Sequence, residues 1–231
     1  MRNSVLIAIL LLIAPYSASA DNLIYMDQTG SNASININQD GSSNRVGNTG
    51  SGNDAVSDGA TTTMDIDQIG SSNELDYDIY GDTANITSNI SGSSSDVDIQ
   101  VGTTGGSNAG SDDVDITING DTNVVSTSVG VTATGVDDVD IDVDITGGSN
   151  SVTITEESTA TSITDKITDV DITGGSNTVT ISKSGASQHD TTLNQTGSSS
   201  TYSVTQSGAE ASTVDVTTSG SSSSVTITVT D

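Results

Sequence analysis

The strictest pattern in this chain is the alternation of apolar and polar residues at positions 138–155, which read DVDIDVDITGGSNSVTIT. Aspartate occupies the even positions from 138 to 144, and valine or isoleucine occupies the odd positions from 139 to 145. Successive side chains of a strand point to opposite faces, so this period of two predicts a strand with one apolar face and one ionised face. The Gly-Gly-Ser-Asn sequence that follows predicts a turn before a second alternating strand.

Glycines divide much of the chain into similar units. The intervals from Gly30 to Gly41 and from Gly70 to Gly81 are each eleven residues, enough for a strand of about six residues and a turn. Two such units make one rung of about 22 residues, so we predict an all-β fold, a β-solenoid of stacked strand-turn-strand rungs. The predicted strands are 34–39, 63–68, 75–80, 97–101, 114–119, 123–129, 138–146, 151–155, 169–173, 178–182, 191–195, 202–206, 214–218 and 225–230.

The domain organisation follows from the two segments that lack this alternation. In residues 1–20, Arg2 precedes an apolar run and small residues lead to Ala20, which predicts a secretory signal peptide. The run is too short for a membrane anchor. We therefore expect a secreted, extracellular protein with a single solenoid domain at 21–231, interrupted by an irregular loop or insertion near 45–62.

Composition restricts the partners. The chain has no cysteine, which excludes disulfides and thiolate metal sites. It has 31 acidic residues against 4 basic ones, a formal net charge of −27. Nucleic acids and anionic membranes would be repelled by this charge, so we expect neither as a partner.

Two steps of the form Gln-x-Gly-x-x-Asn occur at 39–44 and 68–73, and a version one residue shorter occurs at 28–32. The pairs Gln28 with Gln39 and Gln195 with Gln206 are each separated by eleven residues. In these features the chain resembles the curlins, the subunits of curli, an extracellular functional amyloid of bacterial biofilms. The residues that carry the resemblance are Gln28, Gly30, Asn32, Gln39, Gly41, Asn44, Gln68, Gly70, Asn73, Gln195, Gly197, Gln206 and Gly208.

The resemblance implies a subunit that stacks on copies of itself, end to end, into a cell-surface fibre for biofilm matrix or adhesion. It also implies a fibre nucleator and an outer-membrane secretion pore as partners. In such a stack, Gln and Asn donate amide hydrogen bonds to the same residue in the next rung, and Gly permits the corners. Between Val97 and Lys183 we expect Asp, Thr or Ser in place of the ladder Gln.

The aspartate face predicts repulsion between rungs. Carboxylates stacked about 4.8 Å apart repel by about 0.9 kcal/mol even in bulk water. One hypothesis is that they slow assembly until salt, acid or divalent cations screen them; the alternative is a solvated face that keeps the protein soluble. Divalent cations are expected only as nonspecific partners, because the run 138–144 lacks the Gly and closing Glu of an EF-hand loop.

Catalysis has no support in the sequence. His189 is the only histidine, and we expect it to be exposed in a polar turn. Neither a Gly-x-Ser-x-Gly elbow nor a phosphate-binding loop with Lys occurs, so we expect no cofactor and no enzymatic activity.

Two alternatives to the fibre subunit remain open. The first is a monomeric solenoid adhesin or surface-display protein whose last strand caps the stack. The second is an ice-binding solenoid, indicated by Thr-x-Thr pairs that begin at Thr153, Thr178 and Thr226. An ice-binding face needs such pairs on successive rungs, and these are 25 and 48 residues apart, which does not match a 22-residue rung.

Overall fold

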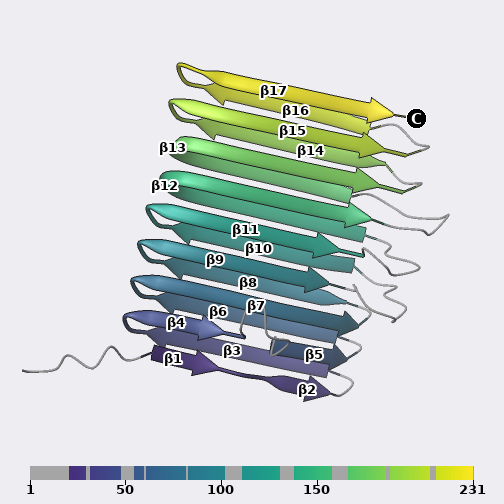
Figure 1. Ribbon diagram of the computed structural model, residues 1–231. Helices are drawn as coiled ribbons and strands as arrows, with labels where there is room; N and C mark the ends of the chain where they lie inside the picture. Colours follow the sequence, from purple (N-terminus) through teal and green to yellow (C-terminus); the bar gives the residue numbers. More distant parts are fainter. Residues whose placement is uncertain are drawn as a thin grey trace, which may run out of the picture.

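The computed structural model describes residues 21–29, 32–47, 55–59, 61–81, 83–101, 111–130, 138–157, 166–185, 188–208 and 212–230. These residues form an all-β stack of parallel strands, drawn in Figure 1. The predicted signal peptide, residues 1–20, and Gly30 lie outside the described residues. The predicted β-solenoid is confirmed.

Each rung consists of two strands joined by a tight turn, so the stack has two walls. The first wall contains β3 (Asn32–Asp40), β6 (Thr61–Ile69), β8 (Ala84–Ser91), β10 (Ser111–Asn119), the first halves of β12 (Asp138–Glu157) and β13 (Lys166–Ser184), β14 (His189–Thr196) and β16 (Ser212–Ser219). The second wall contains β1 (Asp21–Ile24), β2 (Asp27–Thr29), β4 (Ser43–Val46), β5 (Ala55–Gly59), β7 (Ser72–Gly81), β9 (Ser94–Val101), β11 (Thr122–Val129), the second halves of β12 and β13, β15 (Ser199–Ser207) and β17 (Ser223–Thr230).

The core lies between the two walls and consists of aliphatic columns. A column is the set of residues that face one another in register from rung to rung; Val114, Ile141 and Ile86, for example, share one. Most inward side chains of the middle rungs are at most 3% exposed, while the outward positions of the same strands are exposed or half-buried. The alternation in the sequence is therefore the division between core and surface.

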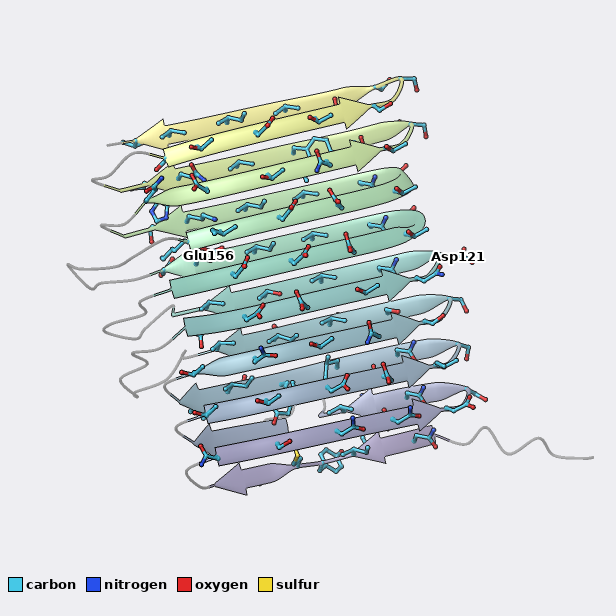
Figure 2. The ribbon with its side chains drawn as sticks, turned by 180° about the vertical axis from the view of Figure 1, so that it is seen from behind. Asp121 and Glu156 are labelled. Carbon is cyan, nitrogen blue, oxygen red and sulfur yellow. The ribbon has the colours of Figure 1, made fainter. Side chains whose placement is uncertain are left out.

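The number of residues per rung varies. Stacked residues are separated by 22 positions between β6 and β8, by 27 between β12 and β13, and by 29 between β3 and β6. The turn that joins the two walls is short in every described rung. The additional residues of the 29-residue step lie between β4 and β5, within the second wall, and those of the 27-residue step lie in the connection from β12 to β13 at the opposite edge. Figure 2 shows the two edges, with Asp121 at the turns and Glu156 beside the connections.

The irregular stretch expected near 45–62 contains regular structure at both ends. β4 and β5 both pair with β7, and Val46 and Ala55 face Leu75 and Tyr77, which are two residues apart. Residues 48–54 between them lie outside the described part of the chain. One strand of the second wall is thus interrupted by an inserted segment and then resumes.

Candidate assembly interface

The C-terminal end of the stack exposes its core. Val225, Ile227 and Val229 of β17 are 42–47% exposed, although they point inward and continue columns whose members in the preceding rungs are buried. Val214 and Val216 of β16 are half-buried against the core. The last rung therefore presents an apolar surface bordered by two unpaired strand edges, which are templates for further strand pairing.

The N-terminal end is better covered but has the same pattern. β1 and β2 are the outermost strands of the second wall, and β3 is the outermost strand of the first wall. Ile24, Met26 and Ile35 are partly buried against the core. Both ends of the described stack thus carry an open strand edge and inward apolar side chains.

A column of glycines forms the turn edge. A Cβ on Gly70 would lie 2.6 Å from the carbonyl oxygen of Gly41, and a Cβ on Gly147 would overlap the carbonyl oxygen of Gly120. The rungs therefore stack at this spacing only because these residues lack a side chain. The column consists of Gly41, Gly70, Gly92, Gly120, Gly147, Gly174, Gly197 and Gly220, and it includes the predicted Gly41, Gly70 and Gly197.

The predicted asparagine ladder lies beside this column. Asn44 Nδ2 donates to Asn73 Oδ1 at 3.3 Å and accepts at Oδ1 from Asn22 Nδ2 at 2.9 Å. A second run continues the ladder, with Asn123 donating to Asn150 at 2.8 Å and Asn150 donating to Asn177 at 2.9 Å. Apart from the half-buried Asn22 these amides are buried, so each bond in the ladder offsets the cost of removing a polar group from water. Serine interrupts the ladder at Ser95 and Ser200.

The glutamine ladder is short. Gln68 Nε2 donates to Gln39 Oε1 at 2.9 Å, and both side chains are buried. Further along the first wall the same column continues with isoleucine and returns to Gln195 near its end, so the expected Asp, Thr or Ser was wrong. The isoleucines are Ile90, Ile118, Ile145 and Ile172.

Four of the remaining predicted residues do not join these ladders. Asn32 is exposed at the start of β3, where it faces Thr61, and Gly208 follows β15 at the connection edge. Gln28 and Gln206 belong to a different column, in the second wall next to the connections. Sequence steps of eleven alternate between the walls, so residues eleven apart need not stack on each other.

The outer face of the first wall carries a dense group of aspartates. Asp115, Asp142 and Asp169 are stacked directly, and Asp140 and Asp144 flank Asp142 on the same strand. Partial burial, followed by repulsion from Asp144, Asp169, Asp115 and Asp140, raises the pKa of Asp142 to about 6. The same two causes raise the pKa of Asp113 and Asp169 above the ordinary value.

A buried polar cluster, which the sequence analysis missed, lies near the connection edge of β12, β13 and β14. Lys183 Nζ is 3.6 Å from Glu156 Oε1, and both side chains are fully buried. Lys183 also donates to the carbonyl of Asp190 at 2.7 Å, and Thr168 hydrogen-bonds Glu156. Lys166 is buried in the facing wall and donates to the carbonyl of Ser184. The sequence did contain an indication of this cluster, because all three charged residues stand at positions where the alternation predicts an inward side chain.

His189 belongs to the same cluster. It lies in β14 with its side chain buried, so the expected exposed turn position was wrong. Burial, and then the nearby Lys166 and Lys183, lower the pKa of His189 to about 4. Burial likewise lowers the pKa of Lys166 to about 8 and raises that of Glu156, despite the opposing effect of Lys183. The ring is neutral at physiological pH and acts here as a core side chain.

Among the described residues, no group of three or more histidines, cysteines or carboxylates could hold a metal ion. No helix in that part of the chain is long and apolar enough to cross a membrane. The features that the geometry does provide are a repeated ladder and two open ends.

Comparison with protein-family models, with curated proteins and with solved structures finds no match for this chain.

Proposed function

We propose that this protein is a secreted structural subunit that assembles end to end into extracellular, amyloid-like fibres of the curli type, for biofilm matrix or adhesion. The observation that carries the proposal is the uncovered core of the last rung, where Val225, Ile227 and Val229 end their columns in solvent. A second copy stacked on β16 and β17 would cover these side chains and pair both strand edges. Covering each of them contributes about 1 kcal/mol, since roughly half of each side chain is still exposed.

The residues at the two ends support the docking of unlike ends. The column that ends at Val225 begins at Ile24, and the column that ends at Val214 begins at Ile35, so apolar residues would meet apolar residues. On the outer face, Asp215 would meet Asn36, whose amide already donates to Asp65 at 3.3 Å within the chain. An amide nitrogen carries two hydrogens, so Asn36 retains a second donor for Asp215.

The distribution of charge supports the same arrangement. The outer face of β10, β12 and β13 is crowded with carboxylates, whereas β16 carries Asp215 alone and β17 has no charged residue. Repulsion between two copies is therefore weakest at the C-terminal end. An adhesin that remains monomeric would gain nothing from an uncharged apolar end.

Fibre formation by the mature chain, residues 21–231, tests the proposal. We expect unbranched fibres by electron microscopy, with growth followed by a cross-β dye. Ile227→Asp places a carboxylate in the docking surface and should slow elongation at least tenfold. Thr228→Asp adds the same charge to the adjacent outward position and should have a much smaller effect.

Far-ultraviolet circular dichroism and the urea midpoint establish that both variants fold. Wild-type protein that stays monomeric in sedimentation would overturn the proposal in favour of the monomeric adhesin. Equal growth rates for folded Ile227→Asp and Thr228→Asp would show that fibres form through another surface.

A further inference from the structure

The residues on the outer face of the second wall change along the stack, from acidic residues on β7 and β9 to hydroxyl residues. From β12 to β17 the outward positions carry hydroxyl side chains in three adjacent columns, which we call the hydroxyl face. Its members are Ser151, Thr153, Thr155, Thr178, Thr180, Ser182, Thr201, Ser203, Thr205, Ser224, Thr226 and Thr228.

These side chains form a regular two-dimensional lattice. Thr153 stacks on Thr180, Thr180 on Ser203, and Ser203 on Thr226, with an unbroken parallel register. Neighbouring strands are about 4.8 Å apart, and alternate residues of one strand are about 6.6 Å apart. The strands run side by side with little change of direction in this part of Figure 1.

This register removes the mismatch between the Thr-x-Thr pairs and a 22-residue rung that counted against an ice-binding face. The separations of 25 and 48 residues did not fit a uniform rung of 22, but the steps in this region are 27 and 23 residues. The Thr-x-Thr pairs of β12, β13 and β17 therefore fall on the same lattice, with the β13 pair displaced by one column, and Ser203 with Thr205 fills the rung between β13 and β17. The sequence alone did not reveal the 27-residue step, because its additional residues lie in the connection from β12 to β13.

The hydroxyl face is also uncharged. In a chain of net charge −27, none of its positions carries Asp, Glu, Lys or Arg, and Glu157 lies at its margin beside the connections. The outer face of the first wall, by contrast, carries Asp140, Asp142 and Asp144 on β12 alone. From β12 to β17, strongly hydrated ions are thus confined to one wall and hydroxyl groups cover the other.

We propose that the hydroxyl face binds ice. A rigid rectangular lattice of methyl and hydroxyl groups fits a ligand that is solid, uncharged and repeated in two directions with similar spacings, and the oxygen rows at the surface of an ice crystal have these properties. β-branched Thr is stiff at χ1, so the lattice is ordered before the ligand arrives. A crystalline polysaccharide fits less well, because no aromatic side chain lies among these positions to stack on a sugar ring.

Ice growth in the presence of folded, freshly purified protein tests the inference, independently of fibre formation. We expect wild-type protein to shape single ice crystals and to depress the freezing point below the melting point. Thr180→Lys places a charged side chain at the centre of the lattice and should reduce this gap at least tenfold. Thr117→Lys adds the same charge to the outer face of the first wall and should leave the gap unchanged.

Chelation by EDTA should have no effect on the gap, because the face contains no carboxylate. Ice crystals that grow as rounded discs in wild-type protein would overturn the inference. Equal freezing gaps for folded Thr180→Lys and Thr117→Lys would also overturn it, by placing the activity on another surface.

Discussion

At the scale of single residues, the turn edge is the most constrained part of the molecule. Each glycine of the column lies against the backbone of the glycine in the neighbouring rung, and the asparagine beside it fixes the same register by hydrogen bonds. At the turn edge, backbone lies against backbone and leaves no room for a side chain. In the core, the side chains between the walls have some freedom to adjust.

Gly147→Ala tests this constraint. The added methyl would overlap the carbonyl oxygen of Gly120, so we expect the free energy of unfolding to fall by about 3 kcal/mol, as for severe overpacking. Gly148→Ala is the matched control, because its methyl would lie 3.1 Å from the nearest backbone oxygen, that of Asp121. Urea denaturation of both variants measures the difference, and similar losses would contradict a backbone clash at Gly147.

The aspartate face makes stability depend on pH. The pKa of Asp142 is raised to about 6 in the folded chain and is about 4 when unfolded, so between these values the folded state binds more protons. The contribution of Asp142 to stability should therefore rise as pH falls from 7 to 4, while that of His189, whose pKa is lowered to about 4, falls over the same range. Asp142→Asn should raise the melting temperature at pH 7.5, and its advantage over the wild-type protein should disappear toward pH 4.5. Identical slopes in scanning calorimetry of both proteins would contradict this.

At the scale of elements, period-two alternation predicts most strands to within a few residues, because the core of each strand consists of the residues that alternate. β8 was not predicted, since Ser88 occupies one of its inward positions and breaks the apolar pattern. β1 and β2 were missed because each is too short to show a period. Which residues stack on which could not be predicted, because register depends on connections whose lengths vary.

Of the candidate site, the sequence predicts the parts that form local motifs and misses those that depend on the register. Residues of the turn edge, such as Gly41, Asn44 and Asn73, were found because their motif is local. The cluster of Lys166, Lys183 and Glu156 was missed, because its members come together only through the register.

Lys183→Met tests the buried pair at this scale. It leaves Glu156 without its cation in the core of β12 and β13, so we expect a loss of about 3–5 kcal/mol in the free energy of unfolding. The double variant Glu156→Leu with Lys183→Met should recover most of that loss, since Val129 and Val101 occupy the same column in the preceding rungs. Chemical denaturation of the two variants checks this, and a double variant as unstable as the single one would contradict it.

At the scale of the whole molecule, the two walls and the two ends have separate chemistry. One wall is acidic, half of the other carries only hydroxyl groups, and the ends are apolar. The hydroxyl face and the C-terminal end meet on β17, where Thr226 and Thr228 alternate with Val225, Ile227 and Val229.

Fibre growth should respond to screening of the acidic wall. We expect growth of the mature chain to be slowest in EDTA at low salt and pH 7.5, and faster with calcium or at pH 4, because cations and protons both reduce repulsion between stacked carboxylates. Dye-binding kinetics in the three conditions measure this. Equal rates would show that the aspartates only keep the protein soluble.

The unequal number of residues per rung has a consequence for design. Steps of 22 and of 28 residues produce the same parallel pairing, so the molecule already accepts changes of length at the connection edge while the glycine edge stays fixed. A foreign peptide spliced between two rungs at that edge would be carried on the outside of an unchanged frame. Splicing several, one per rung, would hold them in a row at the distance between neighbouring strands.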